Sequence, residues 1–256
     1  MKGALRGFRN ITSAIPAIGK PLSALSGLLV FLSGTANGQV ILDNFSANNE
    51  SKYDFVPVFG SPADGWAVAS GELRPSIDGN ASATWLWNQG EKLTGAGNAV
   101  SISLALSADA DNGFPSSIGL FLAADRDSVG FGHEISQITI GGIWTYSVDG
   151  SAQQAASAPS GAVQLSIQRT GEQTVDGFKY NVTFSGGGLP APLTDFFFDS
   201  SPSLQFGPFA YNTAGTPAAL DNLTFTPVPE PSMYAAVFGC LALTMGVIRS
   251  RTSKRA

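Results

Sequence analysis

The chain is poor in cysteine, histidine and charge. Its 256 residues include one cysteine, Cys240, one histidine, His133, and 13% charged residues. A single cysteine excludes an internal disulfide, and a single histidine excludes clustered Cys/His zinc sites. Any Ser-His-Asp triad would have to use His133, yet no Gly-x-Ser-x-Gly motif occurs. We therefore interpret His133 as a surface or strand-edge residue.

Nucleotide and nucleic-acid binding are both disfavoured. The sequence has no Gly-Lys-Ser/Thr P-loop and no dinucleotide fingerprint after a strand. The net charge of −5 is unevenly distributed, because the first 38 residues and the last eight each hold four bases and no acid. Residues 39–226 keep six bases against 18 acids, a net charge of −12. Such a body repels phosphate backbones, so no nucleic-acid partner is expected.

The composition of the central part favours an all-β fold. The chain has 30 glycines and 15 prolines, and 43% of it is apolar. In "AVSISLALSA" the apolar residues from Val100 to Leu106 alternate and share one face. "ISQITI" and "IWTYSV" flank Gly141-Gly142, which predicts a hairpin, and "TGEQTVDG" separates two further strands. About ten to twelve strands over residues 39–226 predict an antiparallel β-sandwich or jelly roll.

Two longer patterns refine this fold. The body opens with "VILDNFS" and closes with "AALDNLTFT", which predicts that its first and last strands pair side by side. The central pattern "SVDG…GAVQLSIQRTG…FKYNVTFSGG" resembles the concanavalin A-like lectin/glucanase jelly roll of LamG-type domains over about 150 residues. This resemblance implies a sugar-binding or adhesive superfamily, but fold alone does not supply a function.

The N-terminus has the features of a secretory signal peptide over residues 1–38. A basic, acid-free region runs to Lys20 and is followed by an apolar core from Leu22 to Leu32. Ala36 and Gly38 then stand at the −3 and −1 positions of a cut before Gln39. The alternative is a mature N-terminal helix or anchor, but the core is short for a membrane span.

Residues 227–256 form a second targeting segment. An uncharged run of 16 residues, 233–248, predicts a transmembrane helix and is followed by an Arg-rich tail that should stay cytoplasmic. Pro229, Glu230 and Pro231 precede it, and the prolines keep the motif out of helix and sheet. The three features in this order closely resemble the PEP-CTERM sorting signal of exopolysaccharide-producing bacteria. The resemblance implies handling by a membrane exosortase.

Two tryptophans are the candidate ligand-binding residues. Trp85 and Trp87 in "ATWLWNQG" are two positions apart, so they face the same side of a strand. An exposed aromatic pair of this kind can stack on sugar rings. The alternative is that both tryptophans fill the core of the sandwich.

Acidic loops are the candidate metal-binding residues. Asp109, Asp111 and Asn112 combine carboxylate and amide oxygens that suit calcium, the one candidate cofactor. Asp43 and Asp221 are a second candidate calcium site if the end strands pair. The alternative is solvated loop carboxylates. The Glu-x-Asp-x-x-Glu pattern of glucanases on this fold is absent.

These patterns together predict a secreted, non-enzymatic surface or extracellular-matrix protein of a Gram-negative-type bacterium. Its expected partners are the exosortase and membrane during sorting, and afterwards an exopolysaccharide or other glycan. Two alternatives stay open. One is a glycan-active hydrolase with a pair of carboxyl groups about 5 to 9 Å apart, and the other is a structural matrix protein without a ligand.

Overall fold

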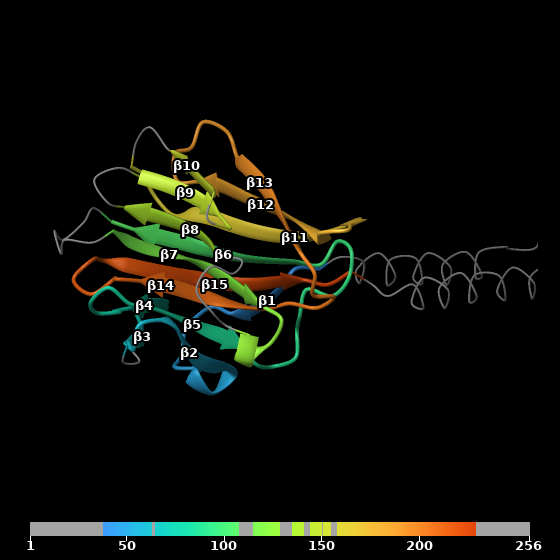
Figure 1. Cartoon of the computed structure of the whole chain (residues 1–256). Coiled ribbons are helices and arrows are strands. Elements are labelled where there is room, and N and C mark those ends of the chain that lie inside the picture. Colours follow the sequence, from blue (N-terminus) through green and yellow to red (C-terminus); the bar gives the residue numbers. More distant parts are fainter. Residues whose placement is uncertain are drawn as a thin grey trace, which may run out of the picture. The chain divides into compact units, whose positions relative to one another are not determined.

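The computed structural model describes residues 38–62, 65–107, 115–128, 135–140, 144–149, 151–154 and 158–228. Fifteen strands and two 3₁₀ helices, η1 (Glu50–Lys52) and η2 (Arg126–Ser128), lie within them. All the strands pair antiparallel in two sheets, which confirms the all-β sandwich (Figure 1). No helix in these ranges is long and apolar enough to cross a membrane. The segments 1–37 and 229–256, with nearly all of the expected signal peptide and residues 233–248, lie outside the described residues.

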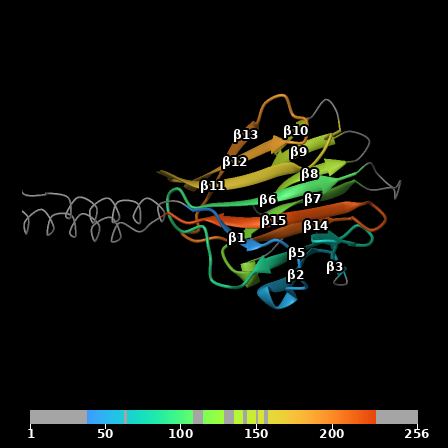
Figure 2. The ribbon, with the colours of Figure 1, turned by 180° about the vertical axis from the view of Figure 1, so that it is seen from behind.

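Sheet A has eight strands in the order β13-β12-β11-β6-β15-β4-β3, and β1 pairs with β15 beside β4. Its strands are β1 (Val40–Asp43), β3 (Trp66–Ala69), β4 (Glu72–Pro75), β6 (Ala99–Leu106), β11 (Val163–Thr174), β12 (Gly177–Gly186), β13 (Leu193–Asp199) and β15 (Ala218–Thr226). Figure 2 shows the central strands β11, β6 and β15 side by side from behind.

Sheet B has seven strands in the order β10-β9-β8-β7-β14-β5-β2. They are β2 (Tyr53–Phe59), β5 (Ser82–Trp87), β7 (Ser116–Ala123), β8 (Ile135–Ile140), β9 (Trp144–Val148), β10 (Ser151–Gln154) and β14 (Gln205–Tyr211). The expected hairpin around Gly141-Gly142 is confirmed, because Ile140 pairs with Trp144 across it.

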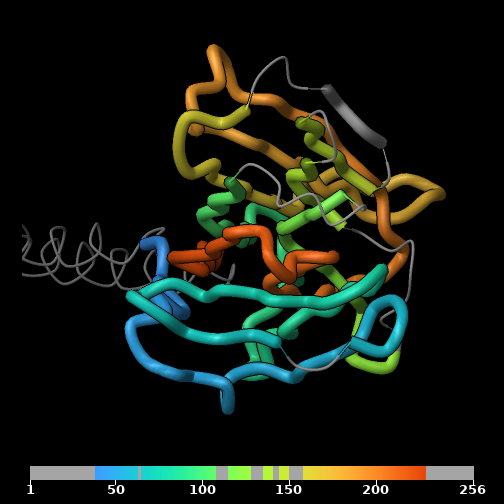
Figure 3. Tube along the Cα trace, turned by 90° about the vertical axis from the view of Figure 1, so that its left-hand side faces the viewer, coloured from blue at the N-terminus to red at the C-terminus, as the bar shows by residue number. Residues whose placement is uncertain are grey.

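The first and last strands of the body pair as predicted. Val40 pairs with Phe225 and Ile41 with Thr224, and Figure 3 shows the blue start of the body beside the red end of β15. The Gln39 side chain adds a 2.7 Å hydrogen bond to the Thr224 hydroxyl. Because β1 pairs with β15, the two ends of the segment 38–228 lie next to each other in sheet A. This segment contains all the described strands and their core.

Two details differ from the sequence-based expectation. The structure has fifteen strands rather than about ten to twelve, because β3, β4 and β10 are only four residues long and carry too little alternation to recognise. The expected eight-residue connection "TGEQTVDG" is mostly strand. β11 runs to Thr174, β12 begins at Gly177 with φ of 121°, and a bulge after Arg169 absorbs the irregular register.

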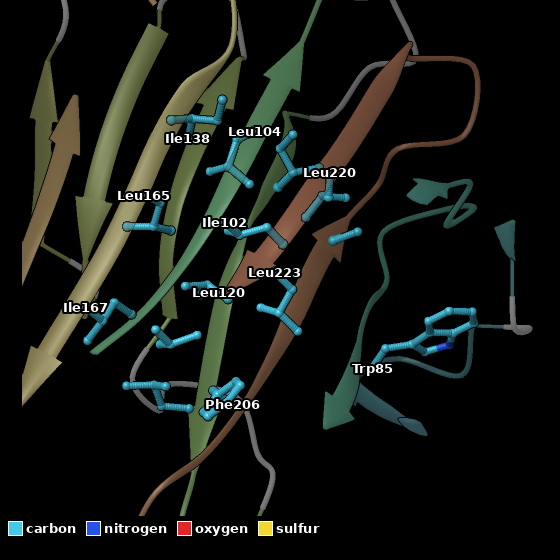
Figure 4. Packing of buried hydrophobic residues seen from close by; sticks show 14 of the residues in the cluster. Trp85, Ile102, Leu104, Leu120, Ile138, Leu165, Ile167, Phe206, Leu220 and Leu223 are labelled. Carbon is cyan, nitrogen blue, oxygen red and sulfur yellow. The ribbon is translucent and has the colours of Figure 1, made fainter. Parts of the chain in front are cut away.

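The core lies between the two sheets. Alternate residues of β6, including Ile102 and Leu104, have no exposed surface, which confirms the predicted inward face. Figure 4 shows them with Leu165 of β11 facing Leu120 and Phe206 from sheet B. Burial of an aliphatic side chain of this size contributes about 1.5 to 3 kcal/mol relative to exposure, so this alternation largely determines which way each strand faces.

Candidate functional site

The tryptophans proposed for ligand stacking are part of the core. Trp85 and Trp87 share one face of β5, as predicted, but that face points inward, and they are 2% and 4% exposed. Trp85 stacks between Tyr53 and Trp66 at ring-centroid distances of 5.3 and 5.5 Å. The Trp87 indole N–H donates a 2.6 Å hydrogen bond to Glu91. The alternative stated above, that both fill the core, is what the structure shows, so neither offers a surface for a sugar ring.

The two end-strand aspartates lie on opposite faces of sheet A. Asp43 is buried and accepts hydrogen bonds from the Phe45 N–H and the Tyr53 hydroxyl. Burial, and secondarily Asp43, raises the pKa of Tyr53, so this hydroxyl remains a donor. Asp221 follows the inward-facing Leu220 and therefore points outward. The second calcium option is therefore not assembled.

The remaining sequence-based site residues lie outside the described ranges. Asp109, Asp111 and Asn112 fall in the gap 108–114, His133 in the gap 129–134, and Pro229, Glu230 and Pro231 beyond residue 228. Within the described parts of the chain, no group of three or more His, Cys, Asp or Glu side chains could hold a metal ion.

The outer face of sheet A carries a groove of about 810 Å³ near one end of its strands. Its floor follows one row across neighbouring strands, in which four positions are alanine and the β4 position is Arg74. Ala67 is opposite Arg74, and Ala219 is opposite Ala105. Ala162, just before β11, continues the row, and all of these residues line the groove. Because the row crosses five strands, the floor is about 19 Å long. We call this feature the alanine groove.

Loops form one wall of the alanine groove and are tied firmly to the sheets. The Ser107 N–H and hydroxyl both donate to the Pro217 carbonyl, at 3.0 and 3.1 Å. The Thr213 hydroxyl accepts from the Ile77 N–H at 3.0 Å, and the Thr216 and Ser116 hydroxyls lie 3.0 Å apart. Because these hydrogen bonds link segments distant in sequence, the wall is preformed, which reduces the ordering cost of binding a ligand.

Charged side chains stand at the β4 side of the groove. Arg74 Nη2 lies 2.8 Å from Glu72 Oε2, and both residues line the groove. In the register of β4 and β15, where Leu73 pairs with Leu220, Asp221 stands opposite Glu72. Burial and, to a smaller extent, the charge of Glu72 raise the pKa of Asp221, whereas a hydrogen bond from the Asn222 N–H lowers it.

These two carboxylates give little support to hydrolysis. A retaining glycosidase needs two carboxyl groups about 5 to 5.5 Å apart that flank the scissile bond. Here Glu72 is paired with Arg74, and both oxygens of Asp221 accept hydrogen bonds from Asn222 at 2.7 Å. The arrangement of Glu72 and Asp221 suits hydrogen bonding to hydroxyl groups better than general acid–base catalysis.

The sequence contains a signal for the alanine groove in three outward alanines. In "AVA", "LAL" and "AAL" the outward positions Ala67, Ala105 and Ala219 carry alanine where an exposed strand position usually carries a polar side chain. Three outward alanines, brought to one row by the strand order, make a depression. The strand order itself was not predictable from these tripeptides.

Comparisons with known proteins assign no family. No family model matches the chain, and no curated protein matches it. Solved structures with a similar arrangement include lectin UEA-II complexed with galactose, at 10% identity and a TM-score of 0.46, covering 75% of this chain and 98% of that one. The winged bean acidic lectin complexed with methyl-α-D-galactose has 10% identity and a TM-score of 0.47, covering 74% and 98%.

A third similar structure comes from a bacteriophage protein. The CBM2 module of the evolved Dit of Lactobacillus casei BL23 phage J-1 has 13% identity and a TM-score of 0.49, covering 75% of this chain and 96% of that one. With TM-scores below 0.5, these likenesses assign neither a family nor a ligand to this chain.

Proposed function

We propose that the chain is an exported, non-enzymatic surface or extracellular-matrix protein whose sandwich binds a glycan in the alanine groove. The observation that carries this proposal is the preformed groove, with its apolar floor and polar rim. A pyranose ring has the matching chemistry, since its C–H faces are apolar and its hydroxyls radiate from the edge. The methyl groups of Ala105 and Ala219 would contact the ring faces.

The charged rim supplies the hydrogen bonds of this proposal. Arg74 donates through its guanidinium and Glu72 accepts through its carboxylate, so together they match a hydroxyl that both donates and accepts. The floor of about 19 Å accommodates several sugar units. The glycan class is therefore an extended oligosaccharide, such as a segment of an exopolysaccharide.

The cellular address in this proposal comes from the two ends of the sequence. The signal-peptide pattern of residues 1–38 directs export, and Pro229, Glu230 and Pro231 with the apolar run 233–248 present a sorting signal to an exosortase at the membrane. The body would then be transferred to the cell surface or extracellular matrix of a Gram-negative-type bacterium.

A second candidate function is a structural matrix protein without a ligand. Burial of Trp85 and Trp87 favours it, and so does the absence of an aromatic side chain among the described residues that line the alanine groove. In this alternative the sandwich would contribute bulk and stability only.

A glycan array probed with residues 38–228, in calcium and in chelator, distinguishes the two functions. Ala67→Trp would fill the groove and abolish binding. Ala69→Trp is the matched control, because this alanine is also exposed on β3 but does not line the groove. Arg74→Ala should weaken binding about tenfold through loss of a charged hydrogen bond. Binding that survives Ala67→Trp would remove the groove from the proposal, and loss of binding in chelator alone would point to the segment with Asp109, Asp111 and Asn112.

The sorting signal needs a separate experiment in an exosortase-bearing host. Glu230→Ala should leave the precursor in the membrane fraction, whereas the unchanged chain is processed and released. Glu50→Ala, a substitution of an exposed glutamate in the body, serves as the control. Equal processing of all three chains would refute sorting by an exosortase, but it would not affect the proposal that the groove binds a glycan.

A further inference from the structure

A second feature of the outer face of sheet A lies at its β13 edge. Phe196 is 52% exposed, and its ring lies 5.7 Å from that of the half-buried Phe198, at an interplanar angle of 85°. Two neighbouring aromatic rings, one of them exposed, present an apolar face with a polarised ring edge on which a ligand can stack. Neither residue lines the alanine groove.

Amide side chains lie beside this aromatic pair in the same row. Gln168 of β11 pairs with Asn181 of β12, and Asn181 pairs with Phe196 of β13. All three side chains are exposed. The next row along the strands brings Thr183 opposite Thr194. An exposed ring, two amides and two hydroxyls thus form one flat surface, which we call the phenylalanine shelf.

The charge around the phenylalanine shelf is balanced. Lys179 Nζ lies 4.5 Å from the centroid of the Phe196 ring and 2.8 Å from Glu172 Oε2. The ammonium is therefore neutralised by its neighbour, and the row itself carries no charge. A neutral surface on a body with a net charge of −12 is suited to a neutral ligand.

The edge strand is poorly suited to pair with another protein strand. Asp195 and Asp199 of β13 lie opposite Val182 and Phe178, on the inward-facing side of the strand. Inward-pointing charges on an edge strand are a common protection against edge-to-edge pairing. This arrangement argues against a second copy of the chain as the occupant of the shelf.

We infer that the phenylalanine shelf is a second glycan-binding site, in which a neutral pyranose ring stacks on Phe196 and its hydroxyls bind Asn181 and Gln168. An amide both donates and accepts, so it can hold adjacent hydroxyls of one ring. The distance from Phe196 to Gln168 is two strand spacings, about 10 Å, which is room for a neighbouring sugar unit. A polysaccharide that crosses β13, β12 and β11 is the ligand that this row fits.

The phenylalanine shelf shares no residue with the alanine groove, so glycan binding at one site can be lost without loss of binding at the other. The shelf faces solvent openly and therefore favours an internal stretch of a polymer over a short oligosaccharide end. On a long polysaccharide, two sites on one face would raise the avidity without new contacts at either site.

Affinity electrophoresis of the full chain in a sugar-free detergent tests this inference. The gels contain one of three neutral soluble polysaccharides, a β-glucan, a galactomannan or a dextran. Phe196→Ala and Asn181→Ala should each weaken retardation about fivefold to tenfold. Phe59→Ala is the matched control, because Phe59 is 40% exposed on β2 of sheet B. Ala67→Trp separates the groove from the shelf.

Each outcome decides the inference. Loss of retardation in the two shelf variants, with Phe59→Ala unchanged, supports it whether or not Ala67→Trp binds. Equal retardation of the unchanged chain and Phe196→Ala overturns it, as does equal loss in Phe196→Ala and Phe59→Ala. Absence of retardation by any of the polysaccharides also overturns it. A dimer in size-exclusion chromatography that dissociates in Phe196→Ala would instead identify a second copy as the occupant.

Discussion

The outer faces of the two sheets differ in composition and in exposure. On sheet A the outward residues of β6, β11 and β12 are mostly alanine, serine, threonine and amides, with the charged Lys179 on β12, and most are at least partly exposed. On sheet B the outward residues of β2, β5, β7 and β14 form a second buried cluster of Val58, Leu86, Phe121, Ala123 and Phe209. Every residue of β5 and of β7 is buried, so these two strands have no solvent-facing side.

The segment after β7 contributes to this difference. Arg126 of η2 lies 3.9 Å from Asp54 of β2, although β14 and β5 separate β7 from β2 in the sheet. The chain that leaves β7 therefore turns over the outer face of sheet B. On sheet A, Gln168, Asn181 and Phe196 are exposed among the described residues. The exposed face therefore carries both proposed binding surfaces, while the covered face adds buried apolar contacts.

The largest effect is expected from the covered face. Phe121 is fully buried, and its ring stacks with that of Phe209 at 6.3 Å. Phe121→Ala should lower the free energy of unfolding by about 3 to 5 kcal/mol, because it leaves a cavity between β8 and β14. Phe196→Ala, the same substitution on the exposed face, should change it by about 0.5 kcal/mol or less. Urea unfolding of residues 38–228 measures both.

Equal effects of these two substitutions would contradict the comparison. A large loss in Phe196→Ala would mean that the phenylalanine shelf is structural, and a small loss in Phe121→Ala would mean that the outer cluster of sheet B contributes little to stability.

The sequence predicted the inner faces of the strands much better than the outer ones. Alternation in β6 identified inward residues such as Ile102 and Leu104, because burial of one face imposes a period of two. Strand β7, "SSIGLFLA", has no such period, since both its faces are buried. Whether an outward residue such as Phe121 is buried depends on a segment elsewhere in the chain, and local pattern cannot show this.

The same limit explains the outcome for the candidate site. Trp85 and Trp87 were correctly placed on one side of a strand, but a pair of large aromatic residues has the same spacing whether it faces solvent or core. The pairing of the end strands was predictable from the repeated Leu-Asp-Asn. The opposite directions of Asp43 and Asp221 were not, because β1 and β15 pair with a register shift between Ile41 and Asp43.

Removal of the inward-facing Asp43 should cost more stability than removal of the outward-facing Asp221. Asp43→Ala removes a buried acceptor and leaves the Phe45 N–H and the Tyr53 hydroxyl without their partner. The expected loss is about 3 kcal/mol. Asp43→Asn keeps one oxygen acceptor and should lose less. Asp221→Ala, at the outward position, should lose less than either, and a reversed order in urea unfolding would refute the assigned orientations.

The smallest effect concerns the pH dependence of the outward aspartate. Burial, with a further contribution from Glu72, raises the pKa of Asp221 in the folded state. The folded chain therefore holds this proton more tightly than the unfolded chain. The resulting stability is fully present below the unfolded pKa of about 3.9 and is lost as the pH rises through the folded value.

Asp221→Asn removes this titration while its amide oxygen still accepts from the Asn222 N–H. The Tm difference between this variant and the unchanged chain should therefore shift in favour of the variant from pH 3.5 to pH 7. Because Asp221 is partly exposed, the change should amount to about 0.5 kcal/mol or less. Glu72→Gln should reduce the same pH dependence by removing the like charge. If neither substitution alters it, Asp221 does not face Glu72 across the rim of the alanine groove, and the charged side of that groove is built differently.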